Sequence, residues 1–272
     1  NGLCTLSYAL RNIHFPENRE AMLAARKRLA FDELLNLHLG MLMLRERNSE
    51  ASSGFVMDKN TDMSEFYGSL PFEMTSSQKR TVDDITNDMC ASRPMNRLVQ
   101  GDVGSGKTAV AAAACFYAAK NLCQSALMAP TEILAQQHYK NVQKYLKSTD
   151  VKSALLTGST TTANRRSIHA GLEDGSIGII IGTHALIEDG VNFHRLGLAI
   201  VDEQHRFGGE QRSKLWSKTV DGVPPHVLVM TATPIPRTLA MTLYGDLDVS
   251  VIDELPPGRK PVRTMQISDG KR

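Results

Sequence analysis

Short apolar runs alternate with longer amphipathic segments after residue 95 or so. The runs are four or five residues long and lie at 97–100, 125–128, 153–156, 177–181, 198–201 and 227–230. Because most of them are apolar at nearly every position, we expect strands that are covered on both faces. Helical patterns lie between most of these runs. The sequence therefore predicts an α/β fold, a three-layer α/β/α sandwich with a mostly parallel sheet.

The beginning of the chain has a different pattern. Residues 17–47 carry apolar positions at spacings of four and three, which is typical of an amphipathic helix, and either one long helix or two short ones would fit. The stripe consists of Ala30, Leu34, Leu37, Met41 and Leu44. Residues 48–70 are rich in Ser, Asn, Asp and Gly, which indicates a linker or mobile loop. We therefore expect a helical segment at 1–47, a linker at 48–70 and a main domain at 71–272.

Composition and charge exclude several classes of protein. Hydrophobic residues make up 42% and charged residues 22%, which is typical of globular domains and excludes a disordered or fibrous chain. The longest apolar run, at 109–119, is too short for the ~18 residues of a membrane span. The net charge is only +2, so any contact with nucleic acid must be local.

The cysteines and the first residues bear on location. The four cysteines form no CxxC pair and have no histidine at zinc-ligand spacing, which favours free thiols over a disulfide or metal framework. The chain does not open with a basic and then apolar signal segment, so we expect a cytoplasmic protein. Because it begins with Asn1 rather than methionine, we also expect a piece of a longer protein.

The segment from Gly101 to Thr108 reads GDVGSGKT and matches the phosphate-loop pattern GxxxxGK[ST]. It lies between a predicted strand and a predicted helix, and a plain glycine-rich turn would not explain all eight positions. Backbone N–H groups of such a loop surround phosphates, Lys107 neutralises the β- and γ-phosphates, and the Thr108 hydroxyl suits Mg²⁺. The candidate residues for ATP are Gly101, Gly104, Ser105, Gly106, Lys107 and Thr108.

An acidic pair follows the buried run at 198–201. Adjacent carboxylates at the end of a buried strand are costly to desolvate without a cation, so Asp202 and Glu203 indicate a metal site. On its own the pair is equally consistent with a surface turn. Downstream of a phosphate loop we expect Asp202 to hold Mg²⁺ and Glu203 to deprotonate the attacking water, with Lys107 as their catalytic partner.

With these two motifs, the chain resembles the first motor domain of superfamily-2 helicases, a RecA-like P-loop NTPase. The resemblance implies that Gln78 reads the adenine base. It implies phosphate contacts along one DNA strand, and coupling between nucleotide and DNA, from further segments in the expected order. The implied DNA-binding residues are Pro130, Thr131, Glu132, Thr157, Gly158, Thr183 and His184. The implied coupling residues are Gln204, His205, Phe207, Thr231 and Thr233.

Longer strings narrow the resemblance. DEQHRFG at 202–208, TATPIPRTLA at 231–240 and DELPPGR at 253–259 resemble the RecG family of bacterial branched-DNA helicases. That resemblance implies a motor that remodels stalled forks and Holliday junctions in DNA repair and recombination. It also implies a wedge domain and a second RecA-like lobe of the same protein, without which we expect weak or no ATP hydrolysis and no unwinding.

The sequence is also consistent with two other functions. The transcription-repair coupling factor shares the phosphate loop and TATPIPRTL, but generally reads DEEH where this chain has DEQH, and lacks DELPPGR. A nucleotide-binding switch module without turnover is the alternative from a different class. DNA-stimulated ATP hydrolysis separates the motors from the switch.

Overall fold

The computed structural model describes residues 2–49, 55–188, 190–202, 218, 223–233 and 247–254. The chain divides into two compact units. One comprises Asn1–Ser52 with Ile235–Val249, and the other comprises Ser53–Pro234 with Ser250–Arg272.

The first unit contains two helices, α1 (Leu6–His14) and α2 (Arg19–Ser49). Of the two arrangements that the sequence allowed for 17–47, the structure shows one uninterrupted helix. α1 lies within the helical segment expected at 1–47, although no pattern located it individually; the Thr5 side chain begins it by accepting a hydrogen bond from the Tyr8 N–H. Its Ala9 is fully buried, as is Ala25 of α2. Small side chains thus allow the two helices to pack closely.

Two leucines of the predicted apolar stripe of α2 are exposed among the described residues. Leu34 is 58% exposed and Leu37 is 45% exposed. The pattern therefore predicted the helix correctly, but the described residues do not show what its apolar face packs against.

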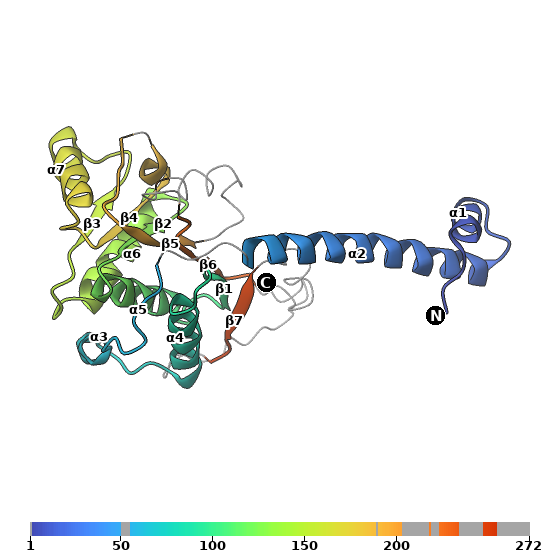
Figure 1. Cartoon of the computed structure of the whole chain (residues 1–272), viewed down its shortest axis with the longest axis horizontal. Helices are drawn as coiled ribbons and strands as arrows, with labels where there is room; N and C mark the ends of the chain where they lie inside the picture. Colours follow the sequence, from blue (N-terminus) through green and yellow to red (C-terminus); the bar gives the residue numbers. More distant parts are fainter. Residues whose placement is uncertain are drawn as a thin grey trace, which may run out of the picture. The chain divides into compact units, whose positions relative to one another are not determined.

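The second unit is built on a seven-stranded sheet of order β3-β4-β2-β5-β6-β1-β7 (Figure 1). All five strand pairs whose register is described are parallel. The strands are β1 (Asn96–Gly101), β2 (Gln124–Met128), β3 (Ser153–Leu156), β4 (Ile179–Gly182), β5 (Leu196–Asp202), β6 (His226–Thr231) and β7 (Asp248–Ile252). The six predicted strands are confirmed to within two residues at each end, and β7 was not predicted.

Helices cover both faces of this sheet, as expected for the three-layer sandwich. They are α3 (Ser64–Ser69), α4 (Ser76–Met89), α5 (Lys107–Lys120), α6 (Glu132–Tyr145), α7 (Thr162–Glu173) and the 3₁₀ helix η1 (His184–Ile187). Buried strand residues alternate between two hydrophobic clusters. Leu127 and Ile200 belong to the cluster with α4, α5 and α6, whereas Ala126 and Ala199 belong to the cluster with α7 and η1. This alternation places one core on each side of the sheet.

Residues 55–70, expected to form part of a linker, are part of the second unit. Phe66 of α3 is fully buried, with its ring centroid 5.6 Å from that of Phe116 in α5. Phe55 and Met57 are buried in the same cluster. The scattered single hydrophobic residues therefore anchor an irregular segment to the main core. The boundary expected near Pro71 lies inside this unit, which begins at Ser53.

Strand order decides which loops lie together. In a parallel sheet all strands end at one edge, so the segments that follow neighbouring strands are themselves neighbours. The segments after β3, β4 and β2 form one group, and those after β5, β6 and β1 form the next. None of the described helices is long and apolar enough to cross a membrane.

Candidate nucleotide and nucleic-acid sites

The phosphate loop connects β1 to α5 and is held by two glycines in left-handed conformations. Gly104 has φ +80° and Gly106, which caps α5, has φ +92°. Other residues adopt such angles only with strain. At Gly106 a Cβ atom would also collide with Nε2 of Gln78. Because these positions have no side chains, the loop can turn its N–H groups toward the N-terminus of α5, where the helix dipole favours an anion.

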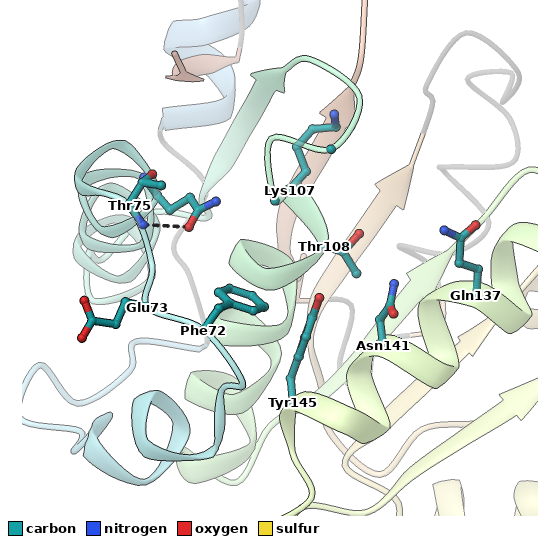
Figure 2. A pocket seen from close by; sticks show the side chains of 11 residues that line it. Phe72, Glu73, Thr75, Lys107, Thr108, Gln137, Asn141 and Tyr145 are labelled. Atoms are coloured by element: carbon teal, nitrogen blue, oxygen red, sulfur yellow. Dashed lines mark hydrogen bonds between the residues drawn. The ribbon is translucent and has the colours of Figure 1, made fainter. Parts of the chain in front are cut away.

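Lys107, the first residue of α5, folds back over the loop that precedes it. Its Nζ donates hydrogen bonds of 2.7 Å to the main-chain oxygen of Gly101 and 3.0 Å to that of Asp102. The ammonium group is therefore held at the mouth of the loop (Figure 2). A point charge at this position suits the phosphates that we expect there.

Gln78 braces the loop from the neighbouring helix α4. Its Nε2 donates a 2.7 Å hydrogen bond to the main-chain oxygen of Ser105, and its Oε1 accepts one of 2.9 Å from the Thr75 N–H. The Thr75 side chain in turn accepts from the Gln78 N–H, which completes a capping box. Gln78 is 2% exposed and lines a cavity beside the loop. The expected role in reading adenine is therefore compatible with this geometry, but Gln78 is also a structural brace.

A histidine that sequence reasoning missed joins the two nucleotide motifs. Nε2 of His138, on α6, lies 2.7 Å from Oδ2 of Asp202, and Nδ1 lies 3.5 Å from the Thr108 hydroxyl. His138 and Asp202 are each only 7% exposed. The signal was present in the sequence, since His138 lies with Ala135 and Val142 on the buried face of its helix. Thr108 and Asp202, both expected to bind Mg²⁺, therefore lie on either side of a single imidazole ring.

A cavity of about 630 Å³ opens beside the loop (Figure 2). One wall carries Phe72 and Tyr145, whose rings meet edge to face with centroids 5.6 Å apart. Burial raises the pKa of the Tyr145 hydroxyl, so the phenol stays protonated at neutral pH. Lys107 and Thr108 also line the cavity. An apolar wall next to a cationic loop fits a ligand with a ring at one end and phosphates at the other.

The donor set at Thr108 and Asp202 fits Mg²⁺. Both offer oxygen ligands, which this ion prefers. The described residues contain no group of three or more His, Cys, Asp and Glu side chains that could hold a metal ion by themselves. Mg²⁺ is usually held by one or two protein groups together with phosphate oxygens and water, so a sparse donor set is expected. The Ser105 hydroxyl is buried and has no hydrogen-bond partner in the part of the chain that the structure describes, which leaves a polar atom in the loop for a ligand.

The predicted DNA-binding residues follow β2, β3 and β4, three neighbouring strands. Thr131 caps α6 by accepting a hydrogen bond from the Leu134 N–H. The two carboxylate oxygens of Glu132 accept hydrogen bonds from the N–H of Ser159 at 3.2 Å and from its hydroxyl at 3.0 Å. Glu132 therefore supports the turn at 157–159. Pro130, which precedes Thr131, is half-buried.

A second support holds the same turn. Arg165 of α7 donates a hydrogen bond of 3.2 Å to the main-chain oxygen of Thr157 and forms an ion pair of 2.7 Å with Glu188. Thr157 is buried, whereas Gly158 is exposed, with a main chain accessible to a ligand. Neither Ser159 nor Arg165 was predicted, since no motif marks them.

The two predicted DNA-binding residues after β4 differ in their exposure to solvent. Thr183 is 3% exposed, and its buried hydroxyl has no hydrogen-bond partner among the described residues, whereas His184 is exposed at the start of η1. His184 thus lies where it can contact a ligand directly.

Between the two nucleotide motifs lies the segment after β6. Thr231 pairs in register with Gln100 of β1, and Met230 pairs with Asp202 of β5. The hydroxyls of Thr231 and Thr233 lie 2.8 Å apart. The remaining predictions, on Glu203, Gln204, His205 and Phe207, fall outside the described residues.

Comparison with known proteins gives a consistent family assignment. The model of the family described as DEAD/DEAH box helicase matches residues 75–242, well over half of the chain. A protein named ATP-dependent DNA helicase RecG from Synechocystis sp. is 52% identical over 271 residues, covering 99% of this chain and 32% of its own length. A protein of the same name from Bacillus subtilis is 50% identical over 257 residues, covering 94% of this chain and 37% of its own length. The chain therefore spans about a third of the length of these relatives.

A solved structure described as RecG bound to a three-way DNA junction superimposes with a TM-score of 0.80 at 44% identity. It covers 93% of this chain, which is 34% of that protein's own chain. The helicase MrfA bound to DNA is 16% identical with a TM-score of 0.54, and this likeness shows the fold alone. Together with the sheet order, these matches establish the expected RecA-like fold.

Proposed function

Because the chain belongs to the DEAD/DEAH box helicase family, we propose that it forms the first motor domain of an ATP-driven DNA helicase or translocase of RecG type. Its substrate is branched DNA, as found at stalled forks and Holliday junctions, and it acts in the cytoplasm in DNA repair and recombination. The observation that carries this proposal is the approach of Thr108 and Asp202 to either side of His138. One MgATP can then engage both motifs.

The proposed roles follow from the chemistry of each group. The loop from Gly101 to Gly106 and the Lys107 ammonium bind the phosphates, and Gln78 reads the base while bracing the loop. Thr108 and Asp202 hold Mg²⁺, directly or through water. Glu203, the next residue along the chain, deprotonates the attacking water. Mg²⁺ supplies charge neutralisation between the β- and γ-phosphates.

DNA binding is assigned to the neighbouring group of strand ends. Main-chain N–H groups and hydroxyls at Thr131, Gly158 and His184 suit phosphate oxygens, which are bound without reading base sequence. We place the coupling of ATP to DNA in Gln204, His205, Phe207, Thr231 and Thr233. Thr231 is well placed for it, because its strand β6 lies between the two strands that carry the nucleotide motifs.

The remaining parts of the machine are expected elsewhere in a full-length protein. Motors of this kind close ATP between two RecA-like lobes, and the second lobe supplies arginines to the transition state. We propose that residues 1–47 connect the motor to a wedge domain, and that residues 71–272 carry the motor's motifs. The 272-residue chain alone should then bind nucleotide weakly and unwind no DNA.

Two alternative functions can be tested by measuring ATP hydrolysis. A transcription-repair translocase would be stimulated by stalled RNA polymerase rather than by branched DNA. A switch module would show no turnover with either. The matches to proteins named RecG favour the first reading, because they cover nearly the whole of this chain.

The decisive experiment measures ATP hydrolysis by a full-length protein that contains this chain, with and without a synthetic three-way junction. We expect junction DNA to raise the rate. Lys107→Ala should abolish hydrolysis and weaken nucleotide binding, whereas Glu203→Gln should retain ATP and stop hydrolysis, since an amide accepts no proton. Normal turnover in either variant would refute the assigned roles. Stimulation by stalled polymerase alone would select the alternative translocase.

A further inference from the structure

The contacts of His138 suggest a role beyond packing. Its side chain belongs to α6, a helix that contributes no residue to either nucleotide motif, yet both ring nitrogens point to atoms proposed as magnesium ligands. A buried imidazole on an apolar helix face costs desolvation unless its polar atoms are paired. Here the pairing groups are a carboxylate at 2.7 Å and a hydroxyl at 3.5 Å.

The chemistry of the acceptor fixes the direction of the stronger bond. An ionised carboxylate only accepts hydrogen bonds, so Nε2–H donates to Oδ2 of Asp202. In this tautomer Nδ1 carries a lone pair, and the Thr108 hydroxyl can direct its proton there. The lone pairs of the Thr108 oxygen and the second oxygen of Asp202 are then both available to a cation. The contact at 3.5 Å is long, so the bond to Asp202 contributes most of the restraint.

We propose that His138 is a positioning residue of the magnesium site: its imidazole orients the Asp202 carboxylate and the Thr108 hydroxyl so that both can receive the metal of a bound Mg–nucleotide complex. The inference rests on the proposed function of Thr108 and Asp202. It adds a third element to that site, since α6 begins at the predicted DNA-binding segment with Thr131 as its cap. His138 therefore lies two turns along a helix from a proposed phosphate contact.

Outer partners of this kind normally have measurable effects on metal affinity. Groups that hydrogen-bond metal-ligating carboxylates fix their orientation, and their loss typically costs ~10- to 100-fold in metal affinity. A residue that only fills space would instead change stability and leave metal affinity alone. The two roles therefore separate in a binding experiment.

The experiment measures binding of a fluorescent ADP analogue to the 272-residue chain as Mg²⁺ is increased, and again in EDTA. His138→Leu fills the space without a donor, and His138→Gln restores an N–H donor. We expect the leucine variant to raise the half-saturating Mg²⁺ concentration about 10-fold. Its affinity in EDTA should stay within about twofold, because the phosphate loop is intact. The glutamine variant should recover most of the loss.

The matched control is His169→Leu. His169 lies on α7 and contributes to neither nucleotide motif, and its buried Nε2 has no hydrogen-bond partner within the described ranges. This variant should leave the Mg²⁺ dependence unchanged. Thermal melting of each variant checks that it is folded at the assay temperature. If the leucine variant is not folded, His138→Met takes its place as the variant without a donor.

The outcomes distinguish a failure of the role of His138 from a failure of the proposed function. A half-saturating Mg²⁺ concentration within twofold of the unaltered chain for the leucine or methionine variant would overturn the role of His138. So would equal shifts in the glutamine and leucine variants, since the hydrogen bond would then be irrelevant. If the unaltered chain itself binds nucleotide without any Mg²⁺ dependence, or binds it equally well with Lys107→Ala, the proposed function fails first and the role of His138 with it.

Discussion

Gln78 donates a 2.7 Å hydrogen bond from Nε2 to the main-chain oxygen of Ser105, in the middle of the phosphate loop. The amide oxygen of the same side chain accepts from the Thr75 N–H at the start of α4. The glutamine thus ties a helix terminus to the loop before any base is bound. Its expected task of reading adenine and its task as a brace are combined in one side chain.

Loss of this brace should affect nucleotides with any base. In the 272-residue chain, we expect Gln78→Ala to weaken GDP binding by roughly five- to tenfold, which corresponds to the ~1 kcal/mol of one hydrogen bond, and ADP binding by more, because ADP also loses the contact to its base. Titration calorimetry with both nucleotides measures this. If only ADP binding falls, Gln78 acts on the base alone and the bond to Ser105 contributes nothing to the loop.

Removal of a buried ring tests whether residues 55–70 belong to the core. Phe66 is fully buried, with Tyr67 and Phe116 within 6 Å by ring centroids. We expect Phe66→Ala to lower the free energy of unfolding by ~3–5 kcal/mol, because the cavity cannot fill. Phe15→Ala, at an 80% exposed position, is the control and should cost less than about 0.5 kcal/mol. Urea unfolding of both variants decides, and equal small losses would assign the segment to a loosely attached linker.

The residues that sequence reasoning located share one property: their chemistry is carried by contiguous positions. The phosphate loop occupies eight adjacent residues, and the buried strands are short runs of apolar side chains, so both are visible without tertiary information. β7 was missed because its strand, DVSVI, alternates in burial and lacks such a run. The helix α1 was missed for a similar reason, since nine residues give only two turns of pattern.

What sequence reasoning missed depends on contacts between distant positions. Phe55, Met57 and Phe66 look like isolated hydrophobic residues in a polar stretch until the sheet and α5 are folded beneath them. His138 belongs to no motif. Its contact with Asp202 joins residues 64 positions apart, so it appears only in the folded chain. Glu132 was expected to contact DNA because of its place in a motif, yet its carboxylate supports Ser159.

The support that Glu132 gives to the strand-end turn leads to a prediction about DNA. In Glu132→Ala, the Ser159 N–H and hydroxyl lose their acceptors, and the turn at 157–159 loosens. We expect affinity for duplex DNA to fall about three- to tenfold at fixed salt, equivalent to ~1 kcal/mol. The salt slope should not change, because no cation that contacts phosphate is removed. Fluorescence anisotropy of a full-length protein at several salt concentrations measures both quantities.

Glu65→Ala provides a matched control for that substitution. Glu65 pairs with Lys120 at 2.8 Å, at the C-terminal end of α5, far from the edge where the strands end. Its removal should leave DNA affinity unchanged. An equal loss in the two variants would show that the effect of Glu132 is general destabilisation.

A buried histidine should make stability depend on pH. His226 is 1% exposed; its Nδ1 accepts from the Met95 N–H at 2.9 Å and its Nε2 donates to the Phe55 oxygen at 2.8 Å. Burial lowers the pKa of His226 in the folded chain below its ordinary value of about 6.5. The unfolded chain therefore binds the extra proton first. The stabilisation is complete above pH ~6.5 and is lost as the pH falls from there through the lowered pKa.

The test compares melting temperatures of the unaltered chain and His226→Gln between pH 8 and 5. Glutamine keeps an acceptor and a donor but does not titrate in this range. The advantage of the unaltered chain should be largest at high pH and shrink as the pH falls below about 6.5. A gap that stays constant across this range would contradict the linkage.

The position of β1 constrains how the nucleotide site can form. Both neighbours of β1 in the sheet, β6 and β7, come later in the chain, by more than a hundred residues. During synthesis the strand that carries the phosphate loop therefore has no partner until residue 231 has been made. Contacts of such long range are slow to form, so the half of the sheet built from β2, β3, β4 and β5 can assemble first. A nascent chain that stops short of β6 would contain the complete glycine-rich motif and still lack the scaffold that holds it in place.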